Sequence, residues 1–194
     1  HPNVTLTNTT LRNNTANGRA YGAGALYSLQ SNTITINGCT FYNNSGTDAS
    51  SFGVGYHNVA GAVGFFRFNT VSISNSTFTA NSAETSGGAI LSWYNRTHLT
   101  NNTIAYNSVT SSSGKGGGVY VVFMQQSPGH IYLKNNIIAN NWLISFTVPQ
   151  MIERGAEFLS RGYYDSHRNR LCKWCNKRHS NSTRCKTITI YSYN

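Results

Sequence analysis

Residues Val71–Ile90 read VSISNSTFTANSAETSGGAI, and shorter copies of this segment recur along the chain. Its first half follows the pattern apolar, x, apolar, x, Asn or Gly, x, x, apolar, x, x, Asn. Five copies of this half are present, and they begin at Val4, Ile34, Val71, Thr97 and Ile131. Their first residues are 30, 37, 26 and 34 positions apart. A motif that is kept while its spacing varies indicates a repeat architecture whose loops carry the insertions.

The pattern inside each copy predicts short strands and tight corners. Val71 and Ile73 alternate with serines, which is the period of a strand with one buried face. Phe78 is out of step with this alternation, so the chain must turn near Asn75, a residue type that tolerates the left-handed conformation. We therefore expect two or three strands per repeat. The fold class predicted is all-β, a right-handed parallel β-helix solenoid of about five coils over residues 1–145.

Stacking such coils would bring equivalent residues together in columns. The final position of every copy is an asparagine, and the column comprises Asn14, Asn44, Asn81, Asn107 and Asn141. Each of these amides can hydrogen-bond to the coils above and below, so we expect a structural Asn ladder. Small-residue runs follow the copies and are expected to form a third wall; they are Gly22–Leu26, Ala60–Val63, Gly87–Ile90 and Gly116–Tyr120.

Two of these motifs together resemble a known family. The F-x-x-N pairs Phe41–Asn44 and Phe78–Asn81, with the GGAI run Gly87–Ile90, are similar to the repeat of the polymorphic membrane protein family of chlamydiae. The resemblance covers residues 1–145. It implies a pectin lyase-like β-helix that is secreted or displayed at the cell surface or outer membrane, adhesin-like in its best-known members.

The longest insertion is the first candidate for a binding site. The loop Gly46–Asn58 carries Asp48, Tyr56 and His57, and solenoid loops are where binding residues tend to lie. Arg67 is flanked by three phenylalanines and offers an exposed cationic and aromatic patch. The alternative is that the loop only connects strands and that two of the rings pack inward.

The outward positions of the first strand form polar columns. One of them comprises Thr5, Thr35, Ser72, His98 and Tyr132. Flat Thr and Ser arrays occur on ice-binding solenoids, but this array is interrupted at His98. A solvated sheet face is the favoured interpretation.

The acidic residues argue against catalysis. The repeats contain Asp48 and Glu84, which lie in loops of different copies, whereas glycoside hydrolysis and calcium-dependent lysis need clustered carboxylates. The sequence therefore favours a non-enzymatic scaffold for adhesion or carbohydrate contact. The alternative is a fragment of a pectate-lyase-like polysaccharide lyase or hydrolase whose catalytic acids lie outside this chain.

Residues 146–194 form a basic tail, expected to be irregular or to begin a further coil. Its spacing C-x2-C-x3-H-x5-C, from Cys172, Cys175, His179 and Cys185, suits a tetrahedral zinc ion. A disulfide and cysteines without a role are the competing interpretations. The abrupt change in composition also leaves open a shifted reading frame.

Composition limits the partners. Charged residues make up 10% of the chain, although its formal net charge is +10. A chain rich in Asn, Ser, Thr and Gly suits a secreted glycoprotein, and several N-x-S/T sequons are present. We expect contacts with a host or neighbouring cell surface or a polysaccharide, and edge-to-edge self-association. Nucleic-acid binding by the tail ranks last, and the chain has no apolar run of transmembrane length.

Overall fold

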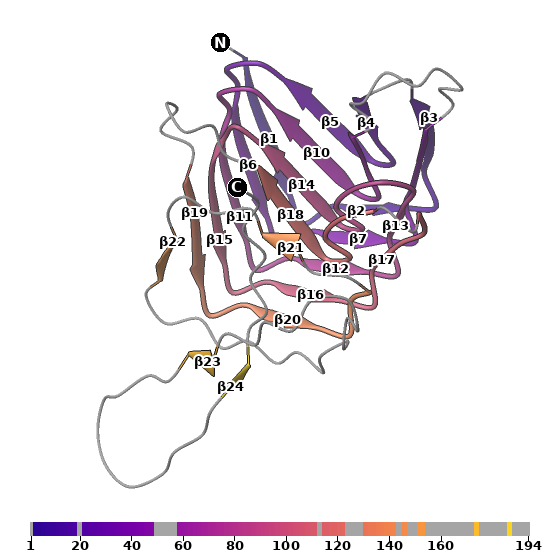
Figure 1. Cartoon of the computed structure of the whole chain (residues 1–194). Helices are drawn as coiled ribbons and strands as arrows, with labels where there is room; N and C mark the ends of the chain where they lie inside the picture. The colour runs from indigo at the N-terminus through magenta and orange to yellow at the C-terminus, as the bar shows by residue number, and fades with distance from the viewer. Residues whose placement is uncertain are drawn as a thin grey trace, which may run out of the picture.

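The chain forms parallel β-sheets that stack strand on strand (Figure 1). The structure is a computed structural model, and no helix occurs among the residues it describes. These are residues 2–18, 21–48, 58–111, 114–122 and 130–142, with the strand residues 145–146, 151–153, 173–174 and 186–187.

Two sheets contain the strands of the repeated motif. Sheet 1 has the order β1 (Asn3–Thr7), β6 (Thr33–Asn37), β11 (Thr70–Ser74), β15 (Arg96–Thr100), β19 (His130–Lys134) and β22 (Met151–Glu153). Sheet 2 has the order β2 (Thr10–Arg12), β7 (Thr40–Tyr42), β12 (Thr77–Thr79), β16 (Thr103–Ala105) and β20 (Ile137–Ala139).

Two further sheets follow along the chain. Sheet 3 comprises β3 (Thr15–Gly18), β8 (Ser45–Asp48), β13 (Ser82–Ala83) and β17 (Ser108–Val109). Sheet 4 comprises β5 (Leu26–Leu29), β10 (Val63–Phe66), β14 (Ile90–Trp93), β18 (Val119–Val122) and β21 (Ser145–Phe146). Between sheets 3 and 4, β4 (Tyr21–Ala23) pairs with β9 (Asn58–Ala60).

The chain therefore passes through sheets 1, 2, 3 and 4 in turn, and we call one such passage a coil. This arrangement is consistent with a parallel β-helix. The sequence predicts two or three strands per repeat, whereas the structure has four sheets. The difference arises because residues just after the Asn column, such as Ser82 and Ala83, also pair with their equivalents in neighbouring coils.

The register confirms the alignment of the copies. Ile34 pairs with Val4 on one side and Val71 on the other, and Phe78 pairs with Phe41 and Ile104. Alternate residues of the sheet 1 strands are buried, as in β6 and β11, so a continuous apolar core runs along the stack. Within it Phe41 and Phe78 stack with ring centroids 4.6 Å apart.

Asparagine amides join the coils at the corner between sheets 2 and 3. The Nδ2 atoms of successive asparagines donate to the Oδ1 of the next, at 2.9 Å from Asn14 to Asn44, 3.0 Å to Asn81, 2.9 Å to Asn107 and 2.9 Å to Asn141. The amides of the last four asparagines also donate to a main-chain carbonyl of the preceding coil, as from Asn81 to Phe41 O at 2.9 Å. The ladder thus satisfies backbone groups that the corner would otherwise leave unpaired.

Two more polar columns were not predicted from the sequence. Asn69 donates to Asn95 Oδ1 at 3.0 Å at the corner before sheet 1, and Asn102 donates to Asn136 Oδ1 at 3.0 Å at the corner before sheet 2. The column before sheet 2 is hard to recognise in the sequence because its residue type changes along the stack. Its first members include Cys39 and Ser76, and its last members are asparagines.

The Gly-rich runs form the entry into sheet 4, because no side chain fits between coils there. A Cβ at Gly88 would lie 1.9 Å from Gly117 O, and one at Gly61 would lie 1.9 Å from Gly88 O. These contacts are with backbone atoms, so a side chain could be accepted only if the coils separated.

Parallel pairing extends to Glu153, into the segment that was expected to be irregular or to begin a further coil. Ser145 and Phe146 pair with β18, and Met151–Glu153 pairs with β19 in sheet 1. Further along, β23 (Lys173–Trp174) and β24 (Lys186–Thr187) pair with each other in antiparallel orientation. At these four residues the pairing therefore differs from that of a further coil.

Candidate functional site

The outward face of sheet 4 is apolar and aromatic. Alternate residues of its strands, such as Val63 and Phe65, belong to the central core, and the residues between them belong to a second buried cluster. One outward column comprises Tyr27, Gly64, Leu91 and Tyr120, and the next comprises Leu29, Phe66, Trp93 and Val122. Large apolar residues on both faces of a sheet indicate that something packs against each face.

Aromatic rings make contact across this face. Phe66 is 1% exposed, and its ring centroid lies 4.9 Å from that of Tyr21, 5.4 Å from Tyr27 and 6.4 Å from Trp93. Trp93 in turn lies 5.4 Å from Tyr94, edge to face. We call these five residues the aromatic cluster. Tyr21 and Tyr27 at its border are 36% and 39% exposed, so part of the cluster faces solvent.

The strand β4 reaches this face because residue 64 is glycine. A Cβ at Gly64 would lie 3.1 Å from Gly22 O and 3.3 Å from Ala23 Cβ. A larger side chain would therefore push β4 away from the sheet. With glycine there, β4 packs close enough for the Tyr21 ring to contact Phe66 edge to face.

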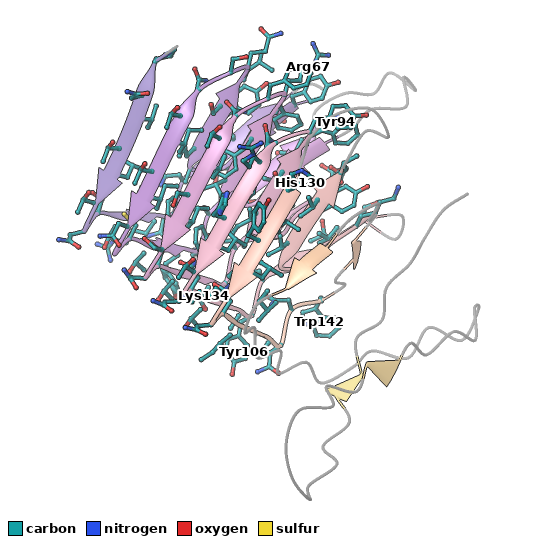
Figure 2. The ribbon with its side chains drawn as sticks, turned by 90° about the vertical axis from the view of Figure 1, so that its left-hand side faces the viewer. Arg67, Tyr94, Tyr106, His130, Lys134 and Trp142 are labelled. Atoms are coloured by element: carbon teal, nitrogen blue, oxygen red, sulfur yellow. The ribbon has the colours of Figure 1, made fainter. Side chains whose placement is uncertain are left out.

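Arg67 and Phe68 follow the cluster in an uncommon backbone conformation. Both have φ of 61°, a left-handed region that costs energy for residues with a side chain. Their N–H groups donate to Trp93 O and Tyr94 O, each at 2.8 Å, so pairing with the next coil stabilises the turn. Both side chains are exposed, and Figure 2 shows Arg67 and Tyr94 at the same edge of the molecule.

The electrostatics keep the Tyr27 hydroxyl protonated. Burial raises the pKa of Tyr27 above its ordinary value of 10.0, and Tyr21 raises it further, whereas Arg67 lowers it. Burial is the largest of these effects, so the net direction is upward. The phenol therefore remains a hydrogen-bond donor at neutral and mildly alkaline pH.

These groups can together bind a ligand that is partly apolar and partly polar. Tyrosine and tryptophan present an apolar ring with a polar tip, and a guanidinium donates hydrogen bonds in a fixed plane. The C–H faces and hydroxyls of a sugar ring match this combination. The surface available to such a ligand is the border of the cluster, where Tyr21 and Tyr27 are 36% and 39% exposed.

The structure describes two of the four predicted binding residues. Arg67 adjoins the aromatic cluster. Asp48 ends β8, with its main chain in register with Gly18, and nothing is described of its side chain. The grouping of Asp48 with Arg67 therefore stays a prediction. Tyr56 and His57 lie outside the described residues.

The predicted metal ligands also lie outside the described residues. Cys172, Cys175, His179 and Cys185 are all in that part of the chain, so the zinc site stays a prediction. Among the described residues, no group of three or more His, Cys, Asp or Glu side chains could hold a metal ion. Cys39 is buried with a free thiol.

Sequence reasoning missed most of the aromatic cluster. Tyr21, Tyr27, Trp93 and Tyr94 were not singled out, because repeat columns draw attention to the residues that the copies share. A signal was present in the strands of sheet 4, LYSL, VGFF, ILSW and VYVV. Their apolar residues occupy both alternating positions, which predicts burial on both faces.

Comparison with protein-family models, with curated proteins and with solved structures finds no match for this chain. The resemblance to the polymorphic membrane protein repeat therefore rests on the F-x-x-N and GGAI motifs. The described residues form an all-β fold of stacked parallel sheets, and this fold class is what the structure defines. Within the described residues, no helix has the length and apolar character needed to cross a membrane.

Proposed function

We propose that this chain is a secreted or cell-surface scaffold that contacts carbohydrate without catalysing a reaction. In this proposal it is a right-handed parallel β-helix of about five coils, and it serves adhesion. The surface that contacts the glycan is the aromatic cluster with Arg67.

The observation that carries the proposal is the chain of ring contacts from Tyr21 and Tyr27 through Phe66 to Trp93 and Tyr94. Buried Phe66 holds its neighbours in place, so binding needs little loss of side-chain freedom. Partly exposed Tyr21 and Tyr27 provide ring surface at the border. The exposed Arg67 side chain adds hydrogen-bond donors at the same edge of the molecule as Tyr94 (Figure 2).

Composition supports an extracellular location. Charged residues are 10% of the chain, and N-x-S/T sequons recur along it. The Asn ladder and the continuous core make a rigid support, on which a surface can be presented to a neighbouring cell.

The alternative is a fragment of a polysaccharide lyase or hydrolase. Hydrolysis of a glycosidic bond needs two carboxyl groups about 5 to 10 Å apart. Glu84 is the one acidic residue whose side chain belongs to the described part of the chain. No described pair of acids therefore favours this alternative.

The proposal is tested by glycan binding. The whole chain is applied to an array of neutral oligosaccharides, and the best binder is titrated by calorimetry against wild type, Tyr27→Ala and Arg67→Gln. We expect each variant to bind roughly tenfold more weakly, because it removes a ring face or charged donors from the contact. Incubation with the same glycan should leave it uncleaved.

Tyr42→Ala is the matched control. Tyr42 is 46% exposed on β7, on the outward face of sheet 2, so its loss removes a comparable ring from another wall. Equal weakening by Tyr42→Ala and Tyr27→Ala would contradict the site. Absence of binding to every glycan would contradict the function, and release of cleaved sugar would favour the enzyme.

A further inference from the structure

The outward face of sheet 1 changes character between β11 and β15. In β1, β6 and β11 the outward residues are uncharged; they are Asn3, Thr5, Thr7, Thr33, Thr35, Asn37, Thr70, Ser72 and Ser74. In β15 and β19 the same positions hold Arg96, His98, Thr100, His130, Tyr132 and Lys134. We call this second set the basic face. The cationic and aromatic residues at these outward positions thus lie on two adjacent strands, β15 and β19.

The register arranges the basic face as three pairs. Arg96 lies beside His130, His98 beside Tyr132, and Thr100 beside Lys134. The His98 and Tyr132 rings stack with centroids 4.4 Å apart and planes 16° apart, and His130 meets Tyr132 edge to face at 6.0 Å. Within the described residues, Nδ1 of His130 is buried and has no hydrogen-bond partner, so ring packing orients it. The centre of the face is therefore preformed.

The charge on this face has one sign. The Arg96 and Lys134 side chains are exposed, and Figure 2 shows His130 and Lys134 toward the two ends of β19. Glu84, the one acidic side chain in the described part, follows β13 on sheet 3 and not a strand of sheet 1. The main chain of Glu153 in β22 is in register with Leu133, and nothing is described of its side chain. A surface with one sign of charge attracts the opposite sign.

The spacing of the charges favours an extended ligand over a single ion. Arg96 begins β15 and Lys134 ends β19, so about 13 Å of strand separates them. One sulfate or carboxylate cannot reach both. Two anionic groups on one polymer that lies along the strands can.

The ring arrangement favours a polysaccharide over a nucleic acid. Single-stranded nucleic acids bind through bases that stack on free aromatic faces. Here His98 already covers one face of Tyr132. A charged glycan needs only cations and hydrogen-bond donors, and the basic face supplies both.

We propose that the basic face, from Arg96 to Lys134, is a second glycan site and that it binds polysaccharides carrying sulfate or carboxylate groups. This inference rests on the proposed contact with carbohydrate, but it concerns a different sheet and a different class of glycan. The aromatic cluster takes the uncharged sugar faces, and the basic face takes the anionic groups.

The test compares two polymers with the same backbone, dextran sulfate and dextran. Binding to the whole chain is measured by surface plasmon resonance at several salt concentrations. We expect dextran sulfate to bind and dextran to bind far more weakly at this site. Arg96→Gln and Lys134→Gln should each weaken dextran sulfate binding roughly tenfold, because each removes a charge-assisted hydrogen bond, and each should reduce the salt dependence.

Arg12→Gln is the matched control, since Arg12 is an exposed cation on β2 of sheet 2. An equal loss in Arg12→Gln and Arg96→Gln would mean attraction to the net charge alone and would overturn the site. Tighter binding of single-stranded DNA, weakened by the same two variants, would overturn the choice of polysaccharide. If every neutral glycan fails to bind while dextran sulfate binds and depends on Arg96 and Lys134, the proposed function fails and this site stands, so the two failures are separable.

Discussion

The side-chain Nδ2 and the main-chain N–H of Asn81 both donate to Oδ1 of Asn107, each at 2.9 Å. The same amide donates to Phe41 O at 2.9 Å, and its own Oδ1 accepts from Asn44. One side chain thus connects three consecutive coils. Because Asn81 is fully buried, water cannot replace these partners.

We expect Asn81→Ala to lower the free energy of unfolding by about 3 kcal/mol or more, because several buried donors and acceptors lose their partner at once. Urea denaturation followed by circular dichroism measures this loss. Asn17→Ala is the control, since Asn17 is exposed in β3, and it should change stability by no more than about 0.5 kcal/mol. Similar small losses in both variants would show that the ladder adds little.

Glycines should differ in their tolerance of alanine according to what surrounds them. At Gly88 a Cβ would lie 1.9 Å from Gly117 O and 2.5 Å from Ser108 O, so Gly88→Ala should prevent normal stacking of the coils. At Gly64 the nearest atom is 3.1 Å away, so Gly64→Ala should fold with a modest loss. Soluble yield and melting temperature measure the contrast. Equal behaviour of the two variants would contradict the close approach of the coils at Gly88.

We expect Phe66 to stabilise the fold as well as to support the aromatic cluster. Phe66→Ala removes a side chain that is 1% exposed, and we expect a loss of about 3 kcal/mol with a change in near-ultraviolet circular dichroism. Phe68→Ala is the control, because Phe68 is 57% exposed and lies only two residues along the chain from Phe66. It should leave stability nearly unchanged. A larger loss in Phe68→Ala than in Phe66→Ala would contradict the packing described for this face.

Stability should fall as the pH drops through the range in which His98 titrates. Burial, and then the positive charge of Arg96, lower the pKa of His98 below its ordinary value of 6.5. The unfolded chain then binds the proton more readily than the folded one, so the contribution is complete above pH 6.5 and is lost as the pH falls through the folded pKa. Denaturation midpoints between pH 7.5 and pH 5, at intervals of about 0.5, should decline.

His98→Gln is expected to make that decline shallower, because glutamine does not titrate. The chain has five acidic residues, so carboxylates contribute little competing pH dependence above pH 5. If the denaturation midpoint of His98→Gln declines with falling pH as steeply as that of wild type, the pH dependence does not come from His98.

Sequence columns predicted much of the fold because a parallel stack repeats its environment at every coil. Phe41, Phe78 and Ile104 meet the same neighbours, so the same residue type suits all three. Asn44, Asn81 and Asn107 share one corner and one set of partners. Sheet 3 was missed because its strands are as short as two residues and carry no apolar alternation.

Of the five residues in the aromatic cluster only Phe66 and Trp93 share a column, so the repeat pattern does not bring the cluster together. Tyr21 reaches Phe66 because β4 lies over Gly64, and this packing depends on the path of a connection rather than on a repeat. On the basic face, His98 and Tyr132 are 34 residues apart, and the sequence predicted that they share an outward column. The register of β15 with β19 confirms this column, and the structure adds that the two rings stack.

The sequence alone determined the strand period, the corners and the Asn column, because these depend on local backbone preferences and on a pattern that every coil repeats. Only the tertiary structure decided which side chains meet on the outward face of sheet 4. Outward residues are not constrained by the shared core, and their neighbours depend on register across coils of unequal length. The candidate binding surfaces are built from these residues.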